Sequence, residues 1–394
     1  MATVDVSSSR FKAGRVGSTA ATVFAEMSAL AVATDSVNLG QGFPDYDGPD
    51  FMLAAAERAI AEGVNQYPPG RGTAALRQAV VDHGRRHYGL DYDPEREVII
   101  TTGATEALAA AILAFVDPGD EVIALEPFYD SYAASVALAG GRIVGVGVFG
   151  PDFVLDLEEL RAVVTPRTKM ILVNSPHNPT GTVLGRPELA TIAELAVEHD
   201  LLVVCDEVYE HLVFDGVEHL PLAGFPGMRE RTLRISSSGK TFSATGWKIG
   251  WALGPAQLVT ELTAVKQFLT YVSGAPFQPA IALALDQGDA WVAAARDELQ
   301  GKRDRLAEGL RSVGLQPAIP LGTYFMTTDV RPLGYDDGVA FCRDLPHRCG
   351  VVAIPHQVFY ARTGAGRPYV RWAFCKSDPV LDEAARRLAG LNAS

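Results

Sequence analysis

VIITTGATEALAAAILAFV, residues 98–116, joins a short β-branched run to a longer Ala- and Leu-rich run. The first run predicts a strand over residues 98–102, and the second predicts a helix over residues 105–116. The same alternation predicts strands over residues 121–125, 142–148, 169–174, 201–205, 232–236 and 249–253, with helices over 129–138, 155–164 and 187–198 between them. Because short strands that alternate with helices indicate βαβ units, we expect an α/β fold with a doubly wound, mostly parallel sheet.

The character of the chain changes after residue 254, where charged helical stretches over residues 256–271 and 291–312 precede an irregular α+β tail. A chain of 394 residues also exceeds the roughly 150 residues that one domain commonly contains. We therefore expect an amino-terminal segment (1–44) that joins the small domain, a large α/β domain (45–285) and a small α+β carboxy-terminal domain (286–394).

Charge and hydropathy exclude several kinds of partner. The 34 Lys and Arg residues face 47 Asp and Glu residues, and the formal net charge of −13 argues against a nucleic-acid-binding surface. The most apolar stretch, residues 107–116, falls far short of the ~20 residues that a membrane span requires. The amino terminus lacks the apolar core of a secretory signal, and the four cysteines form no C-x-x-C pair, so we expect a cytoplasmic protein with reduced thiols and no membrane partner.

One dinucleotide-binding pattern is rejected. Residues 145–150, GVGVFG, match G-x-G-x-x-G, but Pro151 follows and no helical pattern begins before residue 155. A dinucleotide fingerprint needs a helix that opens on its glycines. We therefore interpret the match as the end of a strand.

Lys240 has an unusual sequence context. It lies among Ser, Thr and Gly residues in SSSGKTFSATGWKIGW (236–251), beyond the end of a predicted strand. Two interpretations stay open from these residues alone. Lys240 is either an ordinary turn lysine or a nucleophile whose amine is deprotonated by burial and by the nearby Lys248.

Three further segments follow predicted strands of the same sheet. Residues 174–181, NSPHNPTG, have turn chemistry, and Asp206 emerges at a strand tip as either a helix N-cap or a functional acid. Residues 102–106, TGATE, join a strand to a helix amino terminus, which can bind an anion. Because ligands bind beyond the carboxyl ends of such strands, chemistry is expected in these loops.

Other polar residues near these segments receive structural interpretations. His177 and His211 lack the cysteine or carboxylate spacing of a metal site, so no metal is expected and they are assigned to loop and helix packing. Cys205 is expected to be a buried strand residue. Glu207 is expected to be the exposed neighbour of Asp206.

These segments together resemble the motifs of a known enzyme family. They are TTGATEAL (101–108), EPFYDSY (126–132), NSPHNPTG (174–181), DEVYEHL (206–212), SSSGKTFSATGWKIGW (236–251) and YVRWAFCK (369–376). In this order they resemble the fold-type I, class I/II aminotransferases that use pyridoxal 5′-phosphate, from about Val37 to the carboxy terminus. NLGQGFPDYDGP (38–49) is similar to the kynurenine, glutamine and methionine aminotransferase branch, and NQYPPG (65–70) to its actinobacterial N-succinyldiaminopimelate aminotransferases.

The resemblance implies which residues carry the chemistry. Lys240 would hold the cofactor as a Schiff base and then move a proton between the substrate α-carbon and the cofactor. Asp206 would keep the pyridinium nitrogen protonated, so that the ring acts as an electron sink. Tyr209 and Asn178 would hydrogen-bond the phenolic oxygen of the ring, and Phe128 would stack on the ring.

The resemblance also implies a phosphate site and a second subunit. The backbone N–H groups of Ala104 and Thr105 would bind the phosphate, together with the Ser237 hydroxyl and the Lys248 cation. Many family members have an arginine at the position of Lys248, and lysine keeps the charge without the bidentate fork. Tyr67 would reach the phosphate of the neighbouring subunit, which implies a homodimer with active sites at its interface.

Arg371 by itself is interpreted as a surface arginine of a small-domain strand. The resemblance implies instead that Arg371 binds the substrate α-carboxylate, with Gly42 and Asn178. The implied reaction is a ping-pong transfer of an amino group from an amino acid to a 2-oxo acid, with 2-oxoglutarate as the expected acceptor.

The leading expected substrate is N-succinyl-L,L-2,6-diaminopimelate of lysine biosynthesis. The alternative is a kynurenine, glutamine or methionine aminotransferase with β-elimination of cysteine conjugates as a side activity. A succinylated substrate needs further cations, for which Lys12, Arg15, Arg362 and Arg367 are candidates. A non-catalytic regulatory domain of a transcription factor is disfavoured, because the chain carries no basic helix-turn-helix extension.

Overall fold

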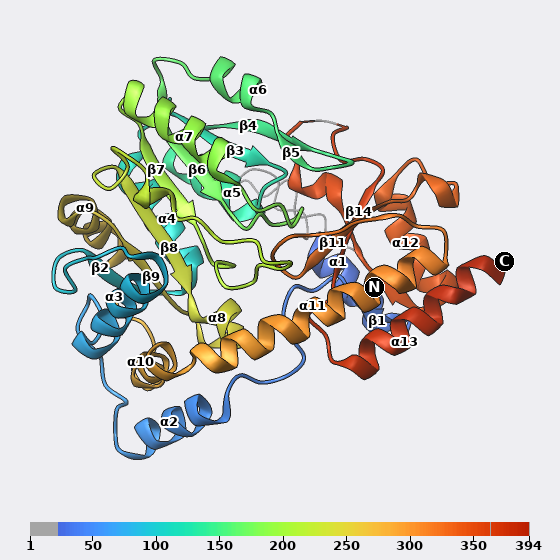
Figure 1. Cartoon of the computed structure of the whole chain (residues 1–394), viewed down its shortest axis with the longest axis horizontal. Coiled ribbons are helices and arrows are strands. Elements are labelled where there is room, and N and C mark those ends of the chain that lie inside the picture. Colours follow the sequence, from blue (N-terminus) through green and yellow to red (C-terminus); the bar gives the residue numbers. More distant parts are fainter. Residues whose placement is uncertain (1–22, 363, 394) are drawn as a thin grey trace, which may run out of the picture.

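The computed structural model describes residues 23–362 and 364–393, and an eight-stranded mixed sheet forms its centre (Figure 1). The strands are β2 (Val98–Thr102), β3 (Glu121–Glu126), β4 (Arg142–Phe149), β5 (Val154–Leu155), β6 (Thr168–Asn174), β7 (Leu202–Asp206), β8 (Thr232–Ser237) and β9 (Ile249–Leu253). Their order in the sheet is β2-β9-β8-β7-β6-β3-β4-β5. Strands β8, β7, β6, β3 and β4 pair in parallel, whereas β9 is antiparallel to both of its neighbours and β5 is an antiparallel edge strand. The expected α/β fold with a mostly parallel sheet is confirmed.

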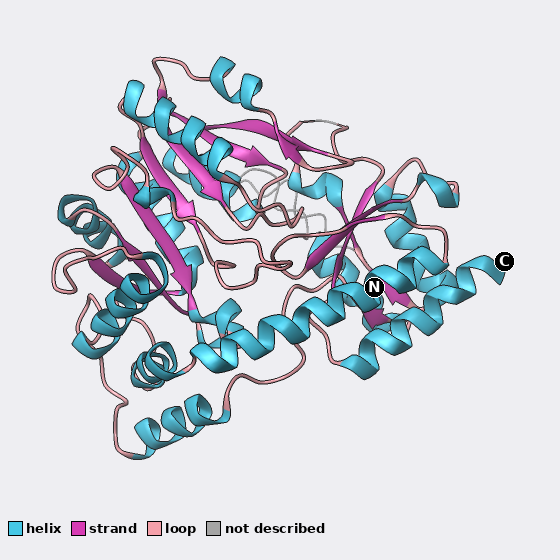
Figure 2. Ribbon diagram, viewed as in Figure 1, coloured by secondary structure: helices cyan, strands magenta, loops and turns pink. Residues whose placement is uncertain are grey.

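Helices cover both faces of this sheet because its strands are apolar on both sides (Figure 2). In β3, Val122 and Ala124 pack against one cluster of helices, and Ile123 and Leu125 pack against the opposite cluster. The first face carries α4 (Gly103–Phe115), α5 (Asp130–Ala139) and α9 (Ala256–Lys266). The opposite face carries α3 (Ala74–Tyr88), α6 (Leu157–Ala162), α7 (Arg186–Glu198) and α10 (Phe277–Gln287), with α2 (Asp50–Ala61) packed on α10.

A second hydrophobic core joins the two ends of the described chain. Its four-stranded sheet has the order β10 (Pro317–Ala318), β11 (Phe325–Asp329), β14 (Tyr369–Ala373) and β13 (Ile354–Pro355). Near it, β1 (Val37–Asn38) pairs in parallel with β12 (Val351–Val352). The helices of this part are α1 (Val23–Ala33), α12 (Gly338–Cys349) and α13 (Asp378–Leu388), and the long α11 (Asp289–Ser312) leads into it (Figure 1). The domain limits after residues 44 and 285 stay a prediction.

Some expected elements differ from the observed ones. The expected helix over residues 155–164 is instead β5 followed by the short α6, because the Asp156 side chain accepts from Glu159 N–H at 2.9 Å and caps the helix there. The expected helix over residues 256–271 ends at Lys266, whose buried Nζ donates to the Tyr271 carbonyl at 2.7 Å. No helix in the described part of the chain is both long and apolar enough to span a membrane.

The G-x-G-x-x-G match lies at the end of a strand, as expected. Strand β4 ends at Phe149, and the next helix begins only at Leu157. The glycines therefore do not open a helix, and a dinucleotide site of the usual kind is excluded here.

Candidate active site

A cavity of about 390 Å³ opens at the carboxyl ends of β2, β6, β7 and β8. These four strands run in the same direction, so their ends meet at one edge of the large sheet. Strands β11 and β14 and residues 41–43 complete the wall. The sequence-predicted residues that line this cavity are Gly42, Ala104, Thr105, Asn178, Asp206, Tyr209, Ser237, Lys240, Lys248 and Arg371.

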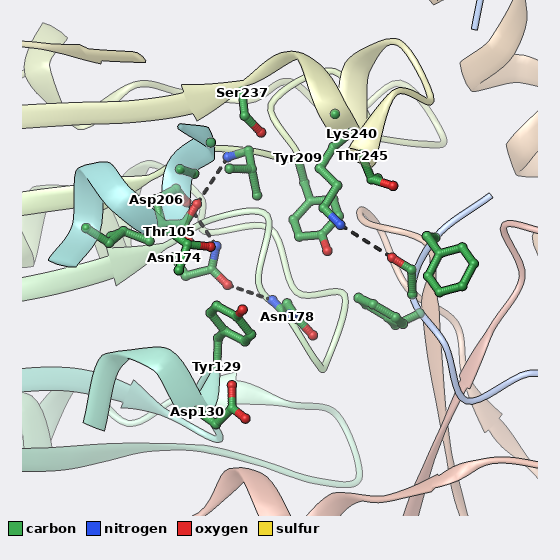
Figure 3. Close-up of a pocket in the computed structure, with 18 of the residues that line it drawn as sticks. Thr105, Tyr129, Asp130, Asn174, Asn178, Asp206, Tyr209, Ser237, Lys240 and Thr245 are labelled. Atoms are coloured by element: carbon green, nitrogen blue, oxygen red, sulfur yellow. Dashed lines mark hydrogen bonds between the residues drawn. The ribbon is translucent and has the colours of Figure 1, made fainter. Parts of the chain in front are cut away.

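Lys240 lies on α8 (Ser238–Thr241), a single turn that begins where β8 ends. Its Nζ donates to Tyr324 Oη at 2.6 Å. It also donates to the Gly42 carbonyl at 3.3 Å, which is the dashed line that leaves Lys240 in Figure 3. Burial lowers the pKa of Lys240 from 10.5 to about 8, and nearby cations add to this shift. About a tenth of the amine is therefore neutral and nucleophilic at pH 7.

Asp206 is the last residue of β7, and its carboxylate is buried at the cavity. Tyr132 Oη donates to Asp206 Oδ2 at 2.5 Å, and the Val208 N–H donates to Oδ1 at 3.3 Å. Burial raises the pKa of Asp206 from 3.8 to about 6, and both hydrogen bonds oppose that shift. Within residues 23–362 and 364–393, no basic side chain pairs with this carboxylate, which leaves it able to hold a cationic N–H of a ligand.

The first turn of α4 forms an anion-binding end of the cavity. Gly103 has a φ of +72°, a conformation that suits glycine, and it turns the chain from β2 into α4. The N–H groups of Ala104 and Thr105 lie in this first turn, where an α-helix offers them no internal acceptor. Lys248 Nζ lies 3.1 Å from the place that a Cβ on Gly103 would occupy, and Ser237 lines the same cavity. These donors suit a phosphate.

Arg371 projects from β14 toward the same cavity. Its guanidinium donates from Nη1 to Asn178 Oδ1 at 3.0 Å and from Nη2 to the Gly40 carbonyl at 3.1 Å. The guanidinium carbon lies 3.9 Å from the ring centroid of Phe325 and 4.9 Å from that of Phe359. Its Nε is buried and has no hydrogen-bond partner among the described residues. A buried cation with an unused donor suits a carboxylate ligand.

Asn178 is held by its neighbour in the same loop. Asn174 is the last residue of β6, and its Oδ1 accepts from the Asn178 N–H at 2.8 Å (Figure 3). Asn174 Nδ2 donates to the Asp206 carbonyl at 2.9 Å. Two adjacent strand ends are therefore cross-linked by one amide side chain, which orients both site residues.

The expectation that Phe128 faces the cofactor ring is wrong. Phe128 packs into the core beneath α4, and its N–H donates to the Phe359 carbonyl at 2.9 Å. The next residue, Tyr129, lines the cavity and stands beside Asn178 in Figure 3. Tyr129 precedes α5 in an extended conformation, which turns its side chain toward the strand ends. We therefore assign the ring-stacking position to Tyr129.

Tyr67 lies outside the cavity of its own chain. It is 79% exposed, and its ring packs edge-on against Tyr271 with centroids 5.4 Å apart. Its assignment to the phosphate site of a neighbouring subunit stays a prediction.

Two structural interpretations near Asp206 are wrong. Glu207 is buried rather than exposed, because Arg234 Nη2 lies 2.6 Å from its Oε2. His211 does not lie on a helix, since residues 208–211 form turns, and its Nε2 lies 2.9 Å from His83 Nε2. His177 packs within its loop, where Nδ1 lies 2.7 Å from Thr180 Oγ1.

One buried group has the donor geometry of a metal site. The ligand atoms of Glu207, Glu210 and His219 lie within 4.8 Å of one another. Arg234 already contacts both carboxylates, at 2.6 Å and 3.5 Å, and supplies a cation at this place. The group is explained as a buried ion-pair network, and the expected absence of a metal stays a prediction.

Residues 34–388 match the family model of aminotransferase class I and II. The chain belongs to this aminotransferase family. A Mycobacterium tuberculosis protein described as a probable N-succinyldiaminopimelate aminotransferase is 58% identical over 94% of this chain and 96% of its own length. The solved structure of the M. tuberculosis N-succinyldiaminopimelate aminotransferase matches with a TM-score of 0.94, covering 96% of this chain and all of that chain. The methionine aminotransferase of Escherichia coli is 39% identical over 94% of this chain and 96% of its own length.

Members of this aminotransferase family depend on pyridoxal 5′-phosphate, and the cavity residues fit that cofactor. The α4 amino terminus and Lys248 suit its phosphate, and the buried Asp206 carboxylate suits its pyridinium nitrogen. Lys240 offers an amine with a lowered pKa beside the same cavity. The phosphate, the ring nitrogen and the aldehyde of the cofactor therefore each have a chemically matched partner.

Sequence reasoning missed several residues of this aminotransferase site. Tyr129 and Tyr132 lie in the motif EPFYDSY, so their presence near the site was signalled but their directions were not. Asn174 stands at the start of NSPHNPTG, where its role as a cross-link depends on the adjacent strand. Tyr324 carries no local signal, because it meets Lys240 only through tertiary folding.

Proposed function

We propose that this aminotransferase binds pyridoxal 5′-phosphate through Lys240 and transfers an amino group between N-succinyl-L,L-2,6-diaminopimelate and 2-oxoglutarate. One observation carries the substrate assignment: the 58% identity to the M. tuberculosis protein extends over nearly the full length of both chains. The proposed homodimer follows the assignment of Tyr67 to a neighbouring site.

Each of the cavity residues would have a separate role in the reaction. When bound, the cofactor would draw electrons from the amine-bearing carbon of the substrate. Asp206 would hold a proton at the ring nitrogen, which maintains that electron demand. Arg371 and Asn178 would bind the α-carboxylate and thereby aim the α-carbon hydrogen at the lysine. Lys240 Nζ would take that proton and later return it.

Tyr209 and Tyr129 would position the ring. Tyr209 is buried beside Lys240 and lines the cavity, where its hydroxyl can reach a phenolic oxygen of the ring. Burial raises the pKa of Tyr209, so it remains a neutral hydroxyl donor. Tyr129 would cover one face of the ring.

The succinyl carboxylate needs a cation of its own, and the described residues of the cavity do not supply a further one. Lys240, Lys248 and Arg371 are the cations that line it within residues 23–362 and 364–393, and each has a role already. Arg362 is paired with Glu126 and Glu159, and Arg367 with Asp337, so neither suits this role. Lys12 and Arg15 lie outside the described residues and stay candidates.

A smaller apolar substrate is the second candidate. Phe24 and Phe325 give the cavity an apolar wall beside Arg371. Such a wall suits a methionine or aromatic side chain. The E. coli methionine aminotransferase, 39% identical to this chain, supports this alternative.

Half-reaction kinetics distinguish the two substrates. The protein is loaded with pyridoxal 5′-phosphate, mixed with N-succinyl-diaminopimelate, glutamate, methionine or kynurenine, and followed by the change in cofactor absorption. The proposal expects the succinylated substrate to give a rate per unit concentration at least tenfold above methionine and kynurenine. A reversed ranking would favour the second candidate.

A lysine variant tests the cofactor assignment itself. Lys240→Ala is expected to lose turnover and the visible absorption of the lysine-bound cofactor, because the other lysine that lines the cavity, Lys248, lies at the phosphate end beside Gly103. Lys169→Ala removes an exposed lysine of β6 and is the matched control. Retained turnover in Lys240→Ala would refute the assignment.

A further inference from the structure

One buried hydroxyl joins three distant segments of the chain at Lys240. Tyr324 lies just before β11, is 1% exposed, and sits behind the lysine rather than on the cavity wall. Its Oη accepts from Lys240 Nζ at 2.6 Å and donates to the Gly42 carbonyl at 2.6 Å. Gly42 lies in the amino-terminal loop, Lys240 on α8 after the large sheet, and Tyr324 in the second core, so this hydroxyl connects all three parts.

The direction of these hydrogen bonds follows from the atoms. A carbonyl oxygen only accepts, so the single proton of Tyr324 Oη points to Gly42. The lone pairs of Tyr324 Oη therefore face Lys240, and Oη accepts a hydrogen bond from the amine. The other acceptor of that amine, the Gly42 carbonyl, lies farther away at 3.3 Å. Tyr324 is thus the principal anchor of the free lysine amine.

Packing holds the hydroxyl in place. The Tyr324 ring lies perpendicular to Tyr209, with centroids 5.2 Å apart, and 4.8 Å from the ring of Phe325. Gly42 has no room for a side chain, since a Cβ there would lie 2.5 Å from Phe325 Cζ. The carbonyl and the ring are therefore both fixed, and so is the acceptor that they present to Lys240.

We propose that Tyr324 is a positioning residue for Lys240, whose hydroxyl holds the lysine amine in place whenever that amine is not bonded to the cofactor. The inference rests on the proposed cofactor-binding role of Lys240. It predicts that the hydroxyl acts on the capture of cofactor and on the proton-transfer steps, and has little effect on substrate binding.

The sign of the expected pH effect follows from hydrogen bonding. An acceptor stabilises the ammonium form, so removal of Tyr324 Oη lowers the pKa of Lys240 further. Among the described residues, the charged and titratable groups that face Lys240, besides Tyr324 itself, are Asp206, Tyr209, Lys248, Arg371 and Cys375, and they remain in the variant. A change in the pH profile of cofactor binding is therefore attributed to loss of the Tyr324 hydroxyl.

The test compares full-length apoenzymes of the wild type, Tyr324→Phe and Tyr335→Phe. Tyr335 is the matched control because its hydroxyl donates to Asp344, away from the cavity. Each protein is mixed with pyridoxal 5′-phosphate from about pH 6 to pH 10, and the visible absorption of the lysine-bound form is followed. Borohydride reduction and peptide mass spectrometry locate the attachment. Steady-state kcat and KM are then measured on the reconstituted enzymes.

The expected result is specific to Tyr324→Phe. The pH midpoint of cofactor capture moves to lower pH, and kcat falls about threefold to tenfold while KM changes less than about twofold. Tyr335→Phe matches the wild type in each measurement. A Tyr324→Phe variant with the wild-type midpoint and kcat, or with a change in KM alone, would overturn the inference.

Two controls separate other causes of failure. If the wild type is not modified at Lys240, the proposed function fails, whatever Tyr324 does. If Tyr324→Phe melts early, 3-fluorotyrosine at position 324 replaces it, because fluorine weakens the hydroxyl as an acceptor and keeps the ring. This variant must shift the capture midpoint in the same direction, and an unchanged midpoint would overturn the inference.

Discussion

At the scale of single residues, burial shifts the pKa values of Asp206 and Lys240 toward each other. Asp206 rises to about 6 and Lys240 falls to about 8, in each case chiefly because burial disfavours the charged form. An acid and an amine that titrate on either side of neutrality are suited to proton transfer at physiological pH. The same burial makes both charges costly for the folded chain.

Asp206→Asn should stabilise the apoprotein at high pH. The folded pKa of Asp206 is raised, so its protonation favours the fold below about pH 4, and this contribution is lost as the pH rises through about 6. At about pH 8 the buried carboxylate costs on the order of 3 kcal/mol, which Asn removes. Thermal melting should show a higher Tm for Asp206→Asn at pH 8 and a much smaller difference at about pH 4, while turnover is lost. A lower Tm at both values would contradict the assigned cost.

Arg371→Ala should damage substrate binding in the transition state. The variant removes a buried cation that contacts Asn178 and Gly40 and whose Nε has no partner in the described part of the chain. Loss of two charge-assisted hydrogen bonds should lower kcat/KM by about two orders of magnitude or more. Steady-state kinetics with several amino acids test this effect, and Arg371→Lys should recover only part of it because it lacks the fork. An unchanged kcat/KM in Arg371→Ala would remove Arg371 from this role.

At the scale of elements, each strand end contributes its own part of the site. The β2–α4 turn supplies an anion site, β6 and β7 supply Asn174 and Asp206, and β8 leads into the turn that carries Lys240. The parallel strands β6, β7 and β8 place their ends side by side, and β2 ends at the same edge of the sheet beyond β9. The motifs are scattered in sequence but adjacent in the sheet.

Lys248→Ala should weaken cofactor binding through the phosphate. Lys248 is held beside Gly103 by its left-handed backbone, with a φ of 55°, so its charge is fixed near the first turn of α4. Removal of one charge-assisted contact should raise the dissociation constant of pyridoxal 5′-phosphate about tenfold to a hundredfold. Titration of the apoenzyme measures this constant. Lys248→Arg should bind at least as tightly as the wild type, and equal affinity of Lys248→Ala and the wild type would refute the assignment.

At the scale of the whole molecule, an exposed aromatic face lies next to the phosphate end of the site. Tyr67, Phe268 and Tyr271 are 79%, 84% and 53% exposed. The Thr102 and Thr270 hydroxyls lie 3.0 Å apart and connect this face to the start of α4. Exposed aromatic residues of this kind suit a subunit interface. This placement supports the proposal that Tyr67 serves a neighbouring site.

Mixed subunits test that proposal directly. Tyr67→Ala should impair activity, and Lys240→Ala should abolish it. If each site takes Lys240 from one subunit and Tyr67 from the other, a hybrid of the two variants contains one intact site. Random reassembly of equal amounts should therefore restore about a quarter of the wild-type activity. Activity no higher than the average of the two separate variants would contradict a shared site.

The local parts of this protein follow from the sequence because they depend on local physics. Short β-branched runs, helix patterns and turn residues identified most elements of the large sheet and the loops that carry Lys240, Asp206 and Asn178. The wrong predictions arise because local patterns do not show what a side chain contacts in the folded protein. Phe128 and Tyr129 are both aromatic, so the sequence does not distinguish which one faces the cavity, and Glu207 is buried only because Arg234 of the next strand neutralises it.

By itself, the sequence determined the fold class, the family resemblance and the set of candidate residues, since each rests on residue types within short segments. The contacts between side chains that are distant in sequence are known only from the tertiary structure. Tyr324 reaches Lys240 across 84 residues of sequence, and Arg371 reaches Asn178 across 193. Such contacts depend on how strands are ordered and how two cores pack, and no local pattern records them. The net charge of −13 likewise gave no sign of the cationic cavity formed by Lys240, Lys248 and Arg371.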